Sequence, residues 1–483
     1  MKFSAQVGRS AVWAIIGQGS TAVLSMVNFA VVGRFVDPKE YGSFLLAMTV
    51  LAAIQWLSQN AYREPVVQAP NLTDGQINSV FSFTVLVGIV LGAVMCAVAL
   101  YFELEYGSRT IALCVVVLAV KLLLDSTLSV PFALRARELS FKFIARTAIC
   151  ANLLATAINV GLLLMGWGVV ALVLSQAAAA AVTLLAFLYF GGRRYPMTMH
   201  IADLSVLRGY SSHVILWQAL EAVGQTVDRY FIAARLSLTD LGLYGFGKRL
   251  NDVIIDVLVG ATSSVALPAF SQLQHDRERL RNGFLKAVRM MLLVVLPVLA
   301  ALAVTAEDFI PLMFGEKWNG AMGVYRCFLL MGVIQGVGIL QGGLLRSMWK
   351  PGVWTRYQLA QCGANVIVLS IVAGYGIEVL ALSIVIRAYT LWSWVVWQTC
   401  KALDMKFLSY AWELVKPLAV AAAAAACGFW LRQYFDHWHL LVRFVVNGLI
   451  VLLLYGLFAM MFLRPAVMEI VALGRNIVSK KMG

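Results

Sequence analysis

The chain has 483 residues, of which 61% are hydrophobic and 13% are charged, and its mean hydropathy is +0.83. A water-soluble globular protein cannot bury that much apolar surface, so the composition predicts an integral membrane protein. The formal charge of +14 is spread over short loops rather than gathered on one soluble face, which argues against a nucleic-acid partner.

Apolar stretches of about 20 residues, the length that crosses a bilayer as a helix, recur along the whole chain. Six precede a basic break at Arg193 and Arg194, and eight follow it. The first stretch is longer than the apolar core of a secretory signal, so we expect it to stay as a membrane helix. The expected spans are 11–33, 42–62, 77–101, 110–133, 144–166, 168–190, 212–234, 241–267, 287–306, 321–345, 353–374, 376–399, 413–432 and 440–463.

The basic residues in the connections alternate strongly between the two sides of these spans. One side carries 25 Lys and Arg and the other carries 7, with six more inside spans. Cytoplasmic loops concentrate Lys and Arg, so the first side is expected to be cytoplasmic, and both termini lie on it. The short outer connections leave no sizeable loop for a catalytic centre. Glu307, Asp308 and Glu316 in one of them are expected to be solvated loop charges.

Two stretches 200 residues apart resemble each other. Residues 35–44, at the junction of the first two spans, and residues 235–244, at the junction of the seventh and eighth, repeat an acid, a glycine and an aromatic residue in register. An even number of spans separates them, so the repeat is parallel. We expect an all-α polytopic membrane protein with about 14 transmembrane helices in two pseudo-symmetric parallel lobes around a central cavity. The expected parts are residues 1–200, 201–400 and, as two additional spans, 401–483.

Ionisable residues occur inside several expected spans. Each costs about 2.5–3.5 kcal/mol on insertion scales, so by default they mark a hydrated cavity or a specific partner. Lys121 with Asp125, and Lys248 with Asp252, are spaced i,i+4, and we favour structural pairs for both. The remaining intramembrane charges are Glu221, Asp228, Arg229, Arg249, Asp256, Arg326 and Arg387.

Arg387 has the most demanding position of these residues. It follows the expected helix start near Ile377 by ten residues, or about 15 Å, and has no acid within a turn. A guanidinium is suited to phosphate oxygens, so one interpretation is a contact to a phosphate or pyrophosphate group. The other interpretation is a structural contact to backbone carbonyls or to an acid of another helix, such as Asp252 or Asp256. Both stay open.

Three short motifs in chain order resemble the polysaccharide transporter branch of the multidrug/oligosaccharidyl-lipid/polysaccharide exporter superfamily. The resemblance covers nearly the whole chain, and it implies a Wzx-like flippase rather than an enzyme. The motifs are Tyr41-Gly42 after the first span, Asp228-Arg229 closing the seventh span, and Gly242-Leu243-Tyr244 opening the eighth.

The resemblance implies alternating access that carries undecaprenyl-pyrophosphate-linked oligosaccharide repeat units from the inner to the outer leaflet of the bacterial cytoplasmic membrane. The product would feed exopolysaccharide, O-antigen or capsule assembly, with membrane lipids and the polymerase and export machinery as further partners. No cofactor or metal is expected, and the energy would come from the membrane potential or from coupling to H⁺ or Na⁺.

Depth and charge suggest three groups of site residues. Arg387 and Arg249 are hypothesised to contact the pyrophosphate, and Arg63 and Arg146 to capture it at the cytoplasmic mouth. The residues hypothesised to act in gating or ion coupling are Asp228, Arg229, Lys248, Asp252 and Asp256.

Three alternatives remain open. A lipid II flippase would have the same plan of spans and the same basic cavity. A multidrug/cation antiporter is less favoured, because the first span has no acid between Arg9 and Arg34, and such proteins resemble each other in carrying one there. A membrane polymerase or transferase is disfavoured by the short outer loops.

Overall fold

The computed structural model describes residues 2–58, 63, 66–67, 72–204, 212–273, 276–347 and 351–468. Within these ranges the chain forms fourteen α-helices of at least 21 residues, three short 3-10 helices and no strand. Nine of the described helices are long and apolar enough to cross a membrane. The remaining five, α1, α2, α9, α10 and α13, lie where the sequence predicts spans. The prediction of an all-α membrane protein with about fourteen spans is therefore confirmed.

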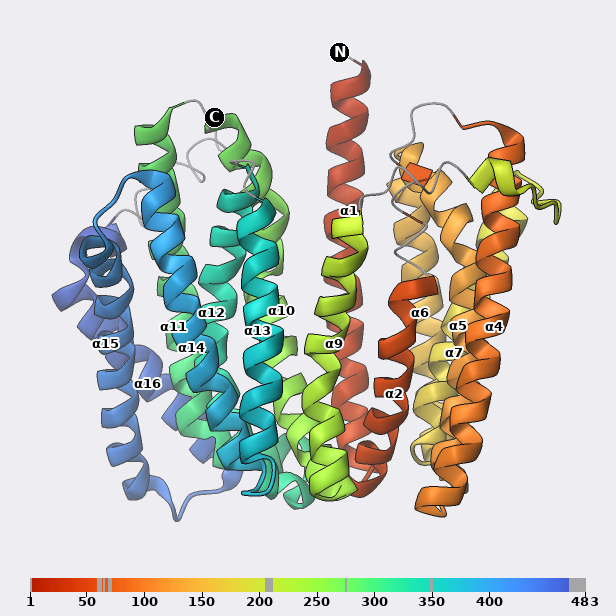
Figure 1. Ribbon diagram of the computed structural model, residues 1–483. Coiled ribbons are helices and arrows are strands. Elements are labelled where there is room, and N and C mark those ends of the chain that lie inside the picture. Colours follow the sequence, from red (N-terminus) through yellow and green to blue (C-terminus); the bar gives the residue numbers. More distant parts are fainter. Residues whose placement is uncertain are drawn as a thin grey trace. The chain divides into compact units, whose positions relative to one another are not determined.

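The helices divide into two compact units (Figure 1). Unit 1 contains residues 1–245 and 365–376, and unit 2 contains residues 246–364 and 377–483. The division falls inside α10 (Leu238–Leu273) and α13 (Pro351–Val372). The lobe boundaries expected at residues 200 and 400 follow the sequence repeat instead, and they stay a prediction, as does the central cavity.

In unit 1, α5 packs against α4, α7 and α2, while α6 packs against α1 and α7. The start of α4 has a capping box, in which the Thr73 hydroxyl accepts a hydrogen bond from the Gln76 amide and the Gln76 side chain accepts one from the Thr73 amide. The helices of this unit are α1 (Lys2–Phe35), α2 (Pro38–Ser58), α4 (Asp74–Tyr106), α5 (Arg109–Arg137), α6 (Phe141–Leu164), α7 (Val170–Phe190), η1 (Ile201–Leu204) and α9 (Ser212–Arg235).

In unit 2, α11 is the central helix and packs against α12, α15 and α16. A buried chain of hydrogen bonds ties three helices together: Trp392 Nε1 donates to Gln341 Oε1, and Gln341 Nε2 donates to the Tyr410 hydroxyl. The helices of this unit are α11 (Arg277–Phe314), η2 (Glu316–Ala321), α12 (Met322–Ser347), α14 (Ile377–Leu403), α15 (Phe407–Arg432), η3 (Gln433–Phe435) and α16 (Leu440–Phe462).

The repeat seen in the sequence is present in the helix ends. Helix α1 ends at Phe35 and α9 ends at Arg235, while α2 begins at Pro38 and α10 begins at Leu238. Both junctions therefore recur at the offset of 200 residues. The six helices from α1 to α7 and the six from α9 to α14 follow in the same order, as a parallel repeat requires.

Candidate functional site

Arg63, in the connection between α2 and α4, is a partly buried cation of unit 1. Its guanidinium lies over the Phe132 ring of α5, 4.1 Å from the centroid, and its Nε has no hydrogen-bond partner among the described residues. Burial lowers the pKa of Arg63, and the nearby Asp125 carboxylate acts in the opposite direction. Since an arginine stays charged in either case, this position offers planar donors to an anion.

Lys121 and Asp125 lie in the middle of α5 and form the ion pair expected from their spacing. Lys121 Nζ is 2.6 Å from Asp125 Oδ2, and the two side chains are only 15% and 14% exposed. Together with Arg63, the group holds two cations and one anion. It therefore has a surplus positive charge in a poorly solvated position, which favours the approach of an anion.

Arg146, on α6, lies apart from this group beside the indole of Trp13 on α1. The Arg146 guanidinium is 5.4 Å and the Lys142 ammonium is 5.9 Å from the Trp13 ring centroid. Arg146 is exposed. The arrangement gives an accessible pair of cations near the start of α6, in the region that the sequence assigns to the cytoplasmic mouth.

Two of the motifs that carry the resemblance meet in the structure: Asp228 of α9 contacts Tyr244 of α10 inside unit 1. The Tyr244 hydroxyl donates to Asp228 Oδ2 at 2.6 Å, and both residues are buried. Asp228 Oδ1 also accepts from the Arg229 amide at 2.9 Å. The Asp-Arg and Gly-x-Tyr motifs are thus two sides of one helix-helix contact.

The charged residues of α10 from Lys248 to Asp256 lie in unit 2 beside α12. Gln335 Nε2 donates to Asp252 Oδ1 at 3.3 Å, and Asn251 Nδ2 donates to Gln335 Oε1 at 3.0 Å. Asp256 acts electrostatically with Arg249 and Asp252. Lys248, one turn before Asp252, is partly exposed, as is Arg249. These residues form a polar patch on a membrane helix, which an unhydrated lipid face would not favour.

Arg387 lies on α14, ten residues after the helix start at Ile377, as expected. Its Nη1 donates to the Gln361 carbonyl oxygen of α13 at 2.8 Å, and it acts electrostatically on Tyr357 of the same helix. The Tyr357 ring stacks with Trp394 at a centroid distance of 6.3 Å. The carbonyl contact is one of the two interpretations made from the sequence. It leaves the second open, because a guanidinium has five N–H donors.

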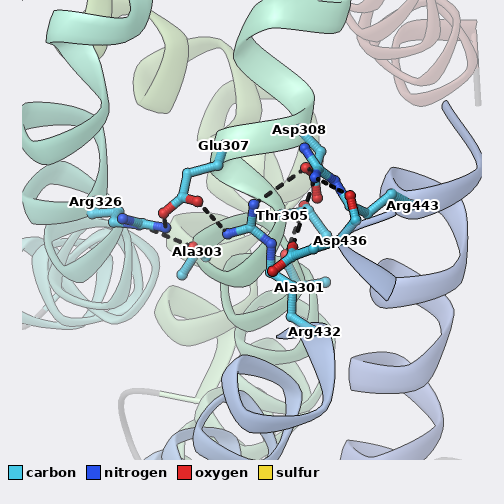
Figure 2. Close-up of polar contacts among 9 residues, drawn as sticks. All are labelled: Ala301, Ala303, Thr305, Glu307, Asp308, Arg326, Arg432, Asp436 and Arg443. Carbon is cyan, nitrogen blue, oxygen red and sulfur yellow. Dashed lines mark hydrogen bonds and ion pairs between the residues drawn. The ribbon is translucent and has the colours of Figure 1, made fainter. Parts of the chain in front are cut away.

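A chain of alternating charges links four helices of unit 2 (Figure 2). Glu307 of α11 contacts Arg326 of α12 at 2.9 Å and Arg432 of α15 at 2.6 Å. Its neighbour Asp308 is 0% exposed and contacts Arg432 and, on α16, Arg443. We call the six residues Glu307, Asp308, Arg326, Arg432, Asp436 and Arg443 the charge chain.

The expectation that Glu307 and Asp308 are solvated loop charges is wrong. Helix α11 continues to Phe314, well past the apolar run, so both acids stand on a helix that faces its neighbours. Their partners on α15 and α16 are more than 120 residues away in sequence. One feature of the sequence could have indicated these ion pairs. The two acids, Arg432 and Arg443 all fall near the outer ends of expected spans, at the same depth in the membrane.

The described residues therefore bring Arg63 close to Asp125, the partner of Lys121, and Asp228 close to Tyr244. They place Arg387 against α13, and Arg146 against α1. Whether any of these residues binds substrate stays a prediction. The fold and its intramembrane cations define a polytopic membrane protein built from two parallel helical repeats, an architecture that many transporters share.

Residues 31–323 match the family described as "Polysaccharide biosynthesis protein". The match covers more than half of the chain, and the chain belongs to this family. Its relatives include the succinoglycan biosynthesis transport protein ExoT of Rhizobium meliloti (strain 1021), at 22% identity over 89% of this chain and 87% of that protein. The lipopolysaccharide biosynthesis protein WzxC of Escherichia coli (strain K12) is 24% identical over 72% of this chain and 71% of that protein.

Solved structures of the same fold include the following transporters. The lipid II flippase MurJ, in an inward closed conformation, matches with a TM-score of 0.74 at 12% identity, over 94% of this chain and 100% of that chain. An inward-facing multidrug resistance MATE family transporter matches with a TM-score of 0.61 at 14% identity, over 81% of this chain and 99% of that chain. At these identities the likeness shows the fold.

Proposed function

We propose that the protein is a flippase that moves polyprenyl-pyrophosphate-linked oligosaccharide units from the inner to the outer leaflet of a bacterial cytoplasmic membrane by alternating access. Two relatives are named for the biosynthesis of succinoglycan and of lipopolysaccharide, and the first is named as a transport protein. The family, the transporter fold and the intramembrane cations support transport rather than catalysis.

The surroundings of Arg63 are the observation on which the proposed substrate class rests. A guanidinium held against a phenyl ring, with a buried Nε that no described residue bonds, is matched by the oxygens of a phosphate or pyrophosphate. Lys121 lies in the same group, and Asp125 balances only one of the two cations. The pyrophosphate would bind there while the polyprenyl chain stays in lipid and the sugars occupy hydrated space.

Arg146, Arg249 and Arg387 complete the proposed route for the head group. Arg146 is accessible beside Trp13 and would capture the pyrophosphate from the cytoplasmic side. Arg387 and Arg249 would contact it deeper in the membrane, with Arg387 anchored by its bond to Gln361. The acids Asp228, Asp252 and Asp256, with Arg229 and Lys248, are the candidates for gating or for coupling to H⁺ or Na⁺.

An interior-negative membrane potential would by itself favour this direction of transport. Outward movement of an anion gains about 2.3 kcal/mol per charge per 100 mV. Both termini are proposed to be cytoplasmic, because the Lys and Arg count assigns them to the basic side. A polysaccharide polymerase and export machinery would consume the product on the outer side.

The lipid II flippase remains the second candidate function. The observation in its favour is the match to MurJ over the full length of that chain. A pyrophosphate-linked lipid is common to both candidates, so the cation group alone does not distinguish them. The two candidates are distinguished by the sugar part of the lipid that accumulates when the protein is depleted.

The first experiment removes the Arg63 charge and measures transport. Arg63→Gln should reduce the export of the oligosaccharide at least tenfold, because a hydrogen bond to a charged group contributes about 1.5–3 kcal/mol. The protein should still accumulate in the membrane. Arg109→Gln is the control, because the Arg109 side chain is 94% exposed and its ion pair with Glu103, at 3.5 Å, lies on the surface. Equal export by both variants would refute the assignment of Arg63.

A further inference from the structure

The segment that follows the first six helices, residues 191–204, is fixed along the first turns of α4. We call it the linker strap. Arg193 Nη2 is 2.8 Å from Asp74 Oδ1 at the first residue of α4, and the Tyr195 ring stacks on Phe81 at a centroid distance of 4.9 Å. The strap therefore packs on the helix instead of extending into solvent, and Figure 1 shows it beside one end of α4.

Hydrogen bonds that involve the side chains of Ser79 and Ser82 also hold the strap against α4. Ser82 Oγ donates to the Thr198 carbonyl at 3.0 Å, and the His200 amide donates to Ser79 Oγ at 3.1 Å. Ser79 Oγ donates in turn to Asp203 Oδ2 at 3.1 Å. From Asp74 to Ser82 the strap runs about 12 Å along α4 and then returns, since a helix rises about 1.5 Å per residue.

The face of α4 beneath the strap is the face that the helix turns toward lipid. Ser79 and Ser82 are 0% and 8% exposed, and the helical spacing from them leads to Leu86 and Ile89. Leu86 and Ile89 are 46% and 52% exposed on a helix that is long and apolar enough to cross a membrane. The strap thus covers polar residues at the end of a lipid-facing stripe.

The strap exposes three apolar side chains near an exposed arginine, with Thr198 and His200 exposed between them. Met197, Met199 and Ile201 alternate along the strap and are 66%, 47% and 75% exposed. Arg194 is exposed and has no ion-pair partner within the described part of the chain. Helix α4 has 33 residues, or about 50 Å, so it extends beyond a hydrocarbon core of about 30 Å. Its first turns, and the strap with them, fall at the interface.

We propose that the linker strap is a binding surface for anionic phospholipid of the basic, cytoplasmic-side leaflet. Met197, Met199 and Ile201 contact the upper acyl chains, and Arg194 binds the phosphate head group. Exposed apolar side chains with one available cation beside them fit this chemistry, because amphipathic segments bury apolar side chains at the headgroup boundary and attract anionic lipid with their basic residues. The strap is then a membrane-embedded anchor, and this inference does not depend on the transported substrate.

Photo-crosslinking tests the contact in the full-length protein, in nanodiscs of phosphatidylglycerol and phosphatidylcholine in equal amounts. The photoreactive residue p-benzoylphenylalanine replaces Met199 in one variant, Ile89 in a lipid-facing control, and Asp404, in the exposed turn before α15, in an aqueous control. Elution of each variant as the monodisperse wild-type peak establishes folding. Mass spectrometry should find lipid adducts at Met199 as at Ile89, and none at Asp404.

A Met199 variant that forms adducts only with protein, or gives no more lipid adduct than the Asp404 variant, would overturn the proposal. The charge is tested by adding Arg194→Gln to the Met199 variant. The excess of phosphatidylglycerol over phosphatidylcholine in the adducts should fall by about fivefold, the effect of one basic residue near an anionic surface. An unchanged ratio would contradict the assignment of Arg194.

Discussion

Gly42 of α2 and Gly242 of α10 lie against each other in unit 1, each facing the carbonyl oxygen of the residue that begins the other's helix. A Cβ placed on Gly42 would overlap the Leu238 carbonyl, and one placed on Gly242 would overlap the Pro38 carbonyl. Gly42 and Gly242 are equivalent positions 200 residues apart, and so are Pro38 and Leu238. The contact is therefore reciprocal, as it would be across a two-fold axis between the repeats.

The helix crossing at these glycines should not tolerate a methyl group. Gly42→Ala or Gly242→Ala is expected to cost about 1–3 kcal/mol by overpacking, because the opposing atoms are backbone and cannot rotate away. Thermal unfolding of the purified protein measures the effect. Gly161→Ala is the control, since nothing lies within 4 Å of a Cβ there. Equal stability of all three variants would show that the crossing is looser than described.

Within the charge chain, stability should depend most on Asp308, the fully buried acid. Asp308→Asn is expected to destabilise the protein by about 1–3 kcal/mol, because Arg432 and Arg443 lose the fully buried carboxylate that they share and keep Glu307 and Asp436 as their acidic contacts. Asp436→Asn, at a side chain that is 54% exposed and 3.7 Å from Arg443, should cost at most about 1 kcal/mol. Thermal unfolding in detergent compares the two, and a larger loss at Asp436 would contradict the burial pattern.

A double-mutant cycle tests whether Lys121 and Asp125 only neutralise each other. Lys121→Met alone should be destabilising, by about 1–3 kcal/mol, because the poorly exposed Asp125 carboxylate loses its 2.6 Å ion-pair partner and keeps Arg63 as a nearby cation. Lys121→Met combined with Asp125→Leu should restore most of the stability. If Lys121 also binds the pyrophosphate, as the proposed function requires, the stable double variant will still export poorly. Full export by the double variant would make the pair purely structural.

Arg387→Gln separates the two interpretations of this residue. A glutamine amide retains a donor for the Gln361 carbonyl but carries no charge. We expect stability to change little while export falls at least tenfold, the consequence of losing about 1.4 kcal/mol or more of head-group binding. Parallel measurements of unfolding temperature and export are needed. Normal export by the folded variant would contradict the head-group contact and favour a structural role for Arg387.

The spans could be predicted from the sequence because hydropathy is local, and the repeat because its helix ends keep their spacing. The Lys121–Asp125 pair was predictable from its i,i+4 spacing within one helix. The pairing of Asp308 with Arg443 was not, because it joins helices far apart in the chain. The sequence marks Tyr244 only as part of a motif. That its hydroxyl donates to Asp228 can be seen only in the folded structure, where α9 and α10 pack together.

Arg63 shows the same limit in the proposed site. Its charge after the second span marked it as a cytoplasmic residue, and nothing in its neighbourhood in the sequence indicates Phe132 or Asp125. Arg63 and Val66, two described residues between α2 and α4, pack against α5 and so bring Arg63 to Phe132 and Asp125. The linker strap was likewise seen only as a basic break, because its contacts to α4 join residues more than 110 positions apart.

The most direct test of the central claim is the leaflet distribution of polyprenyl-linked sugars in cells depleted of the protein, measured with a membrane-impermeant probe of the outer leaflet. The proposed function predicts that a non-wall oligosaccharide lipid accumulates on the cytoplasmic side while the cells stay intact. Trapping of lipid II with cell lysis would establish the second candidate instead. Normal crossing of the oligosaccharide lipid would contradict the account.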